Sequence, residues 1–266
     1  MPAHIVPMLD TTISIARQAG AVLRAGVDRE RQVESKGHAD VVTDIDKASE
    51  ALIVTALRQR FPEHAIVAEE GSGRSSASAY TWYVDPLDGT LNYLHGLPIY
   101  CVSLGLLYEG QPYLGVVYDP TRDELFAAER GRGAYLNGRR IHVSRTASLN
   151  VALLTTGFPY ERFSRADNNL REFAHILLKV QDVRRPGSAA LDICYAAAGR
   201  SDGHWELGMK PWDVAAAALI LSEAGGQLSG WHGEPWVVTD ERLVATNGHI
   251  HNQLVTELIQ VGSYTE

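Results

Sequence analysis

Three groups of acidic residues lie where predicted strands end or a predicted helix begins. Glu69-Glu70 follows the apolar run 65–68, Asp85-Pro-Leu-Asp88-Gly-Thr follows the run 81–84, and Asp213 lies in Lys-Pro-Trp-Asp at the first turn of a helix. Carboxylates, together with a backbone carbonyl and water, are the ligands that Mg²⁺ prefers. The residue types and their spacing therefore indicate a magnesium site.

The second group combines features of a metal site and a phosphate site. Pro86 bends the chain after the strand, so that Asp85 and Asp88, three residues apart, can converge on one point. Gly89 allows close backbone approach, and a helix starting at Gly89-Thr90 would direct free N–H groups toward an anion. Any one Asp-x-x-Asp taken alone is more often a turn or a helix cap. Three acidic groups, each beside an apolar segment, are harder to explain together as turns and helix caps.

Composition and charge exclude several classes of protein. The 266 residues include 45% hydrophobic and 21% charged residues, with 24 Lys and Arg against 32 Asp and Glu, a net charge of −8. This balance disfavours direct nucleic-acid binding, which needs clustered basic residues. Cys101 and Cys194 are too few for a disulfide scaffold, so we expect two buried, reduced thiols in a cytoplasmic protein. We find no signal peptide and no apolar run long enough to span a membrane.

The hydrophobic spacing predicts mixed helices and strands, and hence layered sheets covered by helices. A weak composition shift divides the chain into an N-terminal half, 1–145, and a C-terminal half, 146–266, of one compact unit. Thr43 and Asp46 have the spacing of a capping box, and Asn137-Gly138 is typical of a hairpin turn. Helices are expected over 5–25, 45–60, 166–180, 189–198, 211–224 and 252–261. Strands are expected over 65–68, 81–84, 101–108, 112–118, 134–136, 141–143, 151–155 and 243–245.

Four ordered motifs match a known family. The first is Trp82-Tyr-Val-Asp-Pro-Leu-Asp-Gly-Thr-Leu-Asn-Tyr93, and the second runs from Lys210-Pro-Trp-Asp to Gly225-Gly226. The other two are Asp40-Val-Val-Thr-Asp-Ile-Asp46 and Ala68-Glu-Glu70. The chain resembles, over essentially its whole length, the inositol monophosphatase family of Mg²⁺-dependent, lithium-sensitive phosphatases. Ala68 and Ala218 stand where the family commonly has Gly, and neither change removes a ligand.

The resemblance implies a fold and a role for particular residues. It implies an α+β protein with an α-β-α-β-α layered sandwich, the sugar-phosphatase fold shared with fructose-1,6-bisphosphatase, and a homodimer. Two or three Mg²⁺ per site would be held by the side chains of Glu69, Asp85, Asp88 and Asp213 and by the carbonyl of Leu87. Thr90, held by Asp46, would orient the attacking water together with Glu69. Substrate and phosphate would contact Lys36, Gly89, Thr90, Gly187, Ser188, Ala189 and Glu206.

The resemblance also implies a reaction, and leaves its substrate open. The expected reaction is hydrolysis of a phosphate monoester by metal-activated water in a multi-metal site, with myo-inositol 1-phosphate as the favoured phosphorylated polyol. Fructose 1,6-bisphosphate, histidinol phosphate or a nucleotide 3′-phosphate are alternatives for the same chemistry. Bacterial members of the family can also act as partners of the transcription machinery in ribosomal RNA synthesis, which would require a protein partner here.

Overall fold

Two long helices cover one outer face of the molecule. The computed structural model describes residues 6–29, 32–35, 37, 41–73 and 76–263, and its first helices are α1 (Val6–Gly26) and α2 (Asp44–Arg60). The predicted capping box is confirmed at the start of α2, because Thr43 Oγ1 accepts from the Ile45 and Asp46 N–H groups while the Asp46 carboxylate accepts from the Thr43 N–H. This cap satisfies backbone donors that the helix leaves free and fixes the Asp46 side chain.

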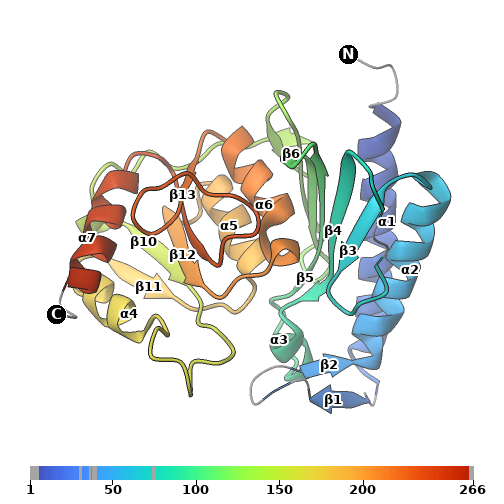
Figure 1. Cartoon of the computed structure of the whole chain (residues 1–266), viewed down its shortest axis with the longest axis horizontal. Coiled ribbons are helices and arrows are strands. Elements are labelled where there is room, and N and C mark those ends of the chain that lie inside the picture. Colours follow the sequence, from blue (N-terminus) through green and yellow to red (C-terminus); the bar gives the residue numbers. More distant parts are fainter. Residues whose placement is uncertain (1–5, 30–31, 36, 38–40, 74–75, 264–266) are drawn as a thin grey trace.

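These helices pack on a seven-stranded sheet (Figure 1). Its strands lie in chain order: β3 (Ala65–Ala68), β4 (Tyr80–Asp88), β5 (Cys101–Tyr108), β6 (Gln111–Asp119), β7 (Glu124–Glu129), β8 (Ala134–Leu136) and β9 (Arg139–Arg140). In the described part of this sheet β3 and β4 are parallel, and every other pair of adjacent strands is antiparallel. The predicted strand 141–143 is wrong, because the chain leaves the sheet there and the Val143 N–H bonds Ala224 O at the end of a helix.

A central pair of helices separates this sheet from a second one. They are α5 (Ala189–Ala197) and α6 (Pro211–Glu223), and α6 lies very close to strands β5 and β6. A Cβ at Gly105 would lie 2.7 Å from Ala215 Cβ, and a Cβ at Gly115 would lie 2.5 Å from Ala216 O. Glycines on the strands and alanines on the helix therefore permit this close approach, which brings the first turn of α6 near the end of β4.

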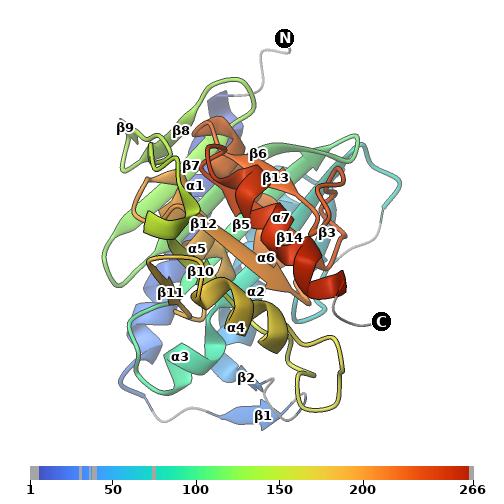
Figure 2. The same ribbon diagram turned by 90° about the vertical axis from the view of Figure 1, so that its left-hand side faces the viewer.

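The second sheet has five strands in the order β11-β10-β12-β14-β13. They are β10 (Leu153–Thr156), β11 (Asp182–Arg184), β12 (Gly203–Leu207), β13 (Gln227–Ser229) and β14 (Arg242–Thr246), preceded by a short 3₁₀ turn, Leu149–Val151. Its outer face is covered by α4 (Leu170–Leu177) and α7 (His251–Ser263), which lie in front of the sheet in Figure 2. Trp205 of β12 is fully buried in the core on this side.

The five layers confirm the expected α+β sandwich. Smaller elements complete it: β1 (Val33–Ser35) pairs with β2 (Val41–Thr43), and α3 (Thr90–Leu94) follows β4. The two large sheets fall on either side of residue 145, and the division of the chain into halves there stays a prediction. Both cysteines are buried, as expected. None of the helices in the described ranges is long and apolar enough to cross a membrane.

Candidate active site

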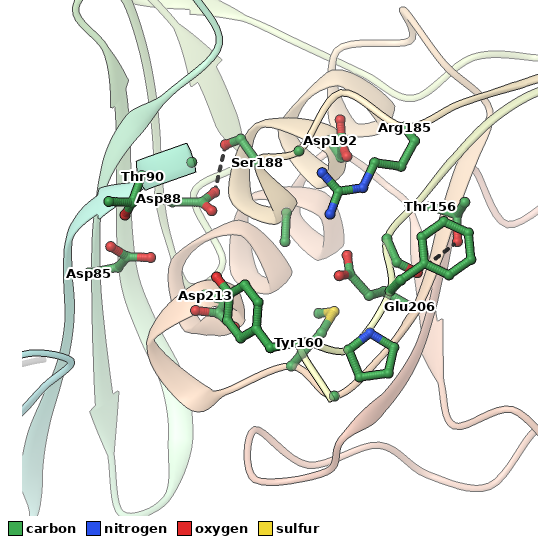
Figure 3. Close-up of a pocket in the computed structure, with 18 of the residues that line it drawn as sticks. Asp85, Asp88, Thr90, Thr156, Tyr160, Arg185, Ser188, Asp192, Glu206 and Asp213 are labelled. Atoms are coloured by element: carbon green, nitrogen blue, oxygen red, sulfur yellow. Dashed lines mark hydrogen bonds between the residues drawn. The ribbon is translucent and has the colours of Figure 1, made fainter. Parts of the chain in front are cut away.

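A pocket lies between the two sheets, where β4 ends and where α5 and α6 begin. Figure 3 shows acidic side chains from both halves of the chain facing it. Most of the residues expected at a metal and phosphate site line this one pocket: Glu69, Asp85, Leu87, Asp88, Gly89, Thr90, Gly187, Ser188, Ala189, Glu206 and Asp213. The tertiary structure therefore brings together residues separated by up to 144 positions in the sequence.

Asp85 is the most deeply buried carboxyl group of this set, with 2% of the residue exposed. Its Oδ1 accepts a hydrogen bond from the Leu87 N–H at 2.9 Å, which closes the turn around Pro86. Burial raises the pKa of the Asp85 carboxyl well above its usual value, and the nearby charges of Glu69, Asp88 and Asp213 raise it further.

Asp88 joins the two halves of the molecule. Its Oδ2 accepts hydrogen bonds from Ser188 Oγ at 2.6 Å and from the Ala190 N–H at 2.8 Å, both at the start of α5. Burial raises its pKa to about 6, although these two hydrogen bonds to the carboxylate act in the opposite direction. Both bonds use Oδ2, so they hold the carboxylate in place on one side only.

Asp213 comes from the first turn of α6 on the other side of the pocket. Its Oδ2 accepts from the Lys210 N–H at 2.7 Å, and Pro211 occupies the first helical position, as the sequence predicts. Burial raises the pKa of the Asp213 carboxyl, and the charges of Glu69 and Asp88 add to the increase. Glu69 follows β3, where its N–H donates to Val84 O at 3.2 Å.

Thr90 is held by groups from two other segments. Its Oγ1 lies 3.0 Å from Asp46 Oδ1 and also 3.0 Å from the Leu87 carbonyl oxygen. Asp46 itself is fixed by the cap of α2, and burial raises the pKa of its carboxyl. Gly89, just before, has a φ of 95°, and a Cβ there would lie 2.8 Å from Ile99 O, so the turn requires glycine.

The far wall of the pocket comes from the second sheet and the segment before α5. Glu206 lies in β12, and Gly187, Ser188 and Ala189 lead into α5. Gly187 has a φ of 94°, which this turn requires. The segment is fixed by Asn92, whose side chain donates to Pro186 O and to Ile99 O, both at 2.8 Å.

Several pocket residues were not predicted from the sequence. Arg185, Asp192 and the segment Thr156–Tyr160 also line the pocket, and Figure 3 shows Arg185 between Asp192 and Glu206. Asp192 lies one helical turn after Ala189, which is the one signal that could have indicated it. Burial, followed by the charge of Glu206, raises the pKa of Asp192 well above its usual value. Lys36 lies outside the described residues.

The donor set fits Mg²⁺. Among the described residues, no three His, Cys, Asp or Glu side chains form a ready-made cage for a metal ion. Mg²⁺ does not require one, because it keeps several waters and binds through one or two carboxylates plus substrate phosphates. Each of Asp85 and Asp213 has a pKa raised by neighbouring carboxylates. A divalent cation would relieve that repulsion, so these residues suit Mg²⁺ chemically.

Comparison with known proteins is consistent with this geometry. The family model described as "Inositol monophosphatase family" matches residues 4–263. An inositol-1-monophosphatase from Synechocystis is 46% identical over 254 residues, which cover 92% of this chain and 88% of the relative. The Nus factor SuhB of Pseudomonas aeruginosa is 42% identical over 95% of this chain and 96% of its own. The solved inositol monophosphatase of Anabaena superposes with a TM-score of 0.88 at 44% identity, covering 97% of each chain.

The layered fold and the acidic pocket define a phosphatase, a hydrolase of phosphate esters. The match over nearly the whole chain and the identity to its members show which one: the chain belongs to the inositol monophosphatase family.

Proposed function

We propose that this chain hydrolyses the phosphate monoester of a small polyol, with myo-inositol 1-phosphate as the favoured substrate, in a Mg²⁺-dependent reaction. The observation that carries the proposal is the meeting of Glu69, Asp85, Asp88 and Asp213 at one pocket, where burial raises the pKa values of the three aspartates and the charges of neighbouring carboxylates raise them further. The printed names of the Synechocystis and Anabaena relatives support the choice of substrate.

In this proposal the four carboxylates and the Leu87 carbonyl oxygen hold two or three Mg²⁺. Oδ1 of Asp88 remains available for this, because its hydrogen bonds to α5 use Oδ2. When bound, Mg²⁺ supplies a Lewis acid that lowers the pKa of water and stabilises negative charge on the leaving oxygen.

The remaining residues position water and substrate. Asp46, anchored by the cap of α2, fixes the Thr90 hydroxyl, and Thr90 with Glu69 orients the water that attacks phosphorus. The N–H groups of Gly89 and Thr90 bind the phosphate, and Lys36 acts near it. Glu206 binds substrate hydroxyls, beside the segment Gly187-Ser188-Ala189. Fixed donors of this kind stabilise charge that develops in the transition state without having to reorganise.

Phosphate release tests the reaction and the substrate together. We would compare myo-inositol 1-phosphate, fructose 1,6-bisphosphate, histidinol phosphate and 3′-phosphoadenosine 5′-phosphate, with and without Mg²⁺. Rapid Mg²⁺-dependent release from the inositol ester is expected, and faster release from another ester would keep the chemistry and change the substrate. Asp88→Asn should lower turnover by about three orders of magnitude or more, whereas the exposed Asp10→Asn serves as the control. Near-normal turnover of Asp88→Asn would contradict the proposed site.

A second function rests on the names of other relatives. Proteins from Pseudomonas aeruginosa and Pasteurella multocida that are 42% and 41% identical to this chain are named Nus factor SuhB. We therefore propose a transcription-machinery partner as the alternative role. A pull-down from cells with the chain and with Asp88→Asn tests it: capture of transcription proteins by both would support a role separate from catalysis. We also expect a homodimer, which sedimentation in solution can test.

A further inference from the structure

Glu206 shares one face of β12 with a buried histidine. Residues two apart in a strand point to the same side of a sheet, so His204 and Glu206 both face the central helices, whereas Trp205 faces the outer layer. His204 is fully buried, and its Nε2 lies 3.1 Å from Glu206 Oε2. Nε2 has no other partner in the described part of the chain, and its approach to Glu206 is too bent for a good hydrogen bond. Glu206 Oε2 is therefore the described carboxylate oxygen within ion-pair distance of this nitrogen.

The other ring nitrogen determines which atom carries the proton. Thr155 Oγ1 lies 2.9 Å from His204 Nδ1 but 3.5 Å from Gly203 O, the limit of a hydrogen bond. The hydroxyl proton is therefore better accepted by Nδ1, which leaves the ring proton on Nε2, toward the Glu206 carboxylate. The opposite tautomer would place a lone pair 3.1 Å from a carboxylate oxygen, which is unfavourable.

One other buried carboxyl group lies near the imidazole. Asp192 of α5 has its Oδ2 3.9 Å from His204 Nδ1, too far for a hydrogen bond, and its Oδ1 has no hydrogen-bond partner among the residues that the structure describes. Burial raises the pKa of Asp192, which favours its neutral form, so it does not compete as an anion for the ring proton.

Gly157 confines the Glu206 carboxylate from the side of the neighbouring strand, β10. This residue directly follows β10, and a Cβ built on it would lie 2.0 Å from Glu206 Oε1 and 2.4 Å from Oε2. The atoms that such a Cβ would meet belong to the end of a flexible side chain. An alanine at this position would therefore displace the Glu206 carboxylate without forcing the backbone to move.

We infer that His204 and Gly157 are positioning residues that fix the Glu206 carboxylate toward the hydroxyl groups of the substrate, and so set the preference for polyol phosphates over simple esters. The inference rests on the proposed function, in which Glu206 binds those hydroxyls. Neither residue contacts the reacting phosphate in this arrangement. Their loss should therefore affect binding of the polyol part more than the chemical step.

Two substrates and four variants test this inference. His204→Asn removes the donor near Nε2, His204→Gln restores one, Gly157→Ala pushes the carboxylate away, and the exposed His232→Asn is the matched control. His204→Asn and Gly157→Ala should raise KM for myo-inositol 1-phosphate about tenfold. This corresponds to the loss of one hydrogen bond between a substrate hydroxyl group and the charged Glu206 carboxylate. Their kcat should stay within about twofold, and so should both constants with p-nitrophenyl phosphate, which has no ring hydroxyls. His204→Gln should recover most of the KM.

Equal losses with both substrates, or an unchanged KM in folded His204→Asn and Gly157→Ala, would overturn the inference. Failure of His204→Gln to recover KM would overturn the role of the N–H donor at the position of His204 Nε2. If the unaltered chain releases no phosphate from either ester, the proposed function fails. In that case the crystal structure of Gly157→Ala still tests whether Gly157 fixes the position of the Glu206 carboxylate. A displaced carboxylate supports this role, and an unmoved carboxylate refutes it.

Discussion

Asp88→Asn should stabilise the metal-free protein while it abolishes catalysis. Burial raises the pKa of Asp88 from the usual 3.8 to about 6. The native state therefore holds this proton more tightly than the unfolded chain does, and the resulting stability is lost as pH rises from 3.8 through about 6. At pH 7 the ionised carboxylate thus destabilises the metal-free native state by about 3 kcal/mol, as an upper limit.

Asparagine removes this penalty and keeps the local hydrogen bonds. Both donors, Ser188 Oγ and the Ala190 N–H, bond the same oxygen, so the amide oxygen of Asn can replace Oδ2. The stability difference between the variant and the unaltered chain should be about 3 kcal/mol at pH 7 and roughly half of that at pH 5. For a chain of this size each kcal/mol corresponds to about 2–4 °C in Tm.

Thermal unfolding in EDTA at pH 7 and pH 5, with Asp10→Asn as the control, measures this difference. Added Mg²⁺ should raise the Tm of the unaltered chain more than that of the variant, because ligands bound by the native state stabilise it by mass action. A variant that is no more stable than the unaltered chain at pH 7, with no change between the two pH values, would refute the argument that burial penalises the ionised Asp88 carboxylate in the metal-free pocket.

Three further predictions concern the layers that position the site. Gly115→Ala should lower the free energy of unfolding by about 1–3 kcal/mol, since its Cβ would meet the backbone oxygen of Ala216 at 2.5 Å; urea titration measures this, and an unchanged midpoint would contradict the close approach of α6. Thr43→Ala should lower the free energy of unfolding by about 1 kcal/mol, because it removes the cap of α2. It should also lower turnover, because Asp46 loses its anchor; full activity of the variant would show that the cap does not support the site. Burial lowers the pKa of His251 to about 4, so the native state resists protonation of this ring. The free energy of unfolding should therefore fall as pH drops from 6.5 toward 4. NMR of the His251 ring measures its pKa, and titration near 6.5 would disprove the prediction.

Local sequence patterns predicted most helices and the longest strands. Strands 65–68 and 101–108 and the cap at Thr43 agree with the structure, because each depends on neighbouring residues only. The sequence did not indicate β7, whose residues Glu-Leu-Phe-Ala-Ala-Glu are mostly good helix formers. Its pairing with β6 and β8 overrides that preference. Strand β12, which carries Glu206, was also missed, because its five residues show no clear alternation.

The types of groups at the site, and the motifs that indicate the family, can be read from the order of residues along the chain. The carboxylates of Asp85 and Asp88 come from one short segment, and their order and spacing are visible without a structure. The environment of these carboxylates, in contrast, depends on how distant segments pack against one another. Ser188 and Ala190 restrain Asp88 from 100 and 102 residues away, and Gly157, which follows the strand β10 paired with β12, confines Glu206 from a distant part of the sequence. Burial and long-range contacts set charge and orientation, and neither is encoded in the spacing of residues along the chain.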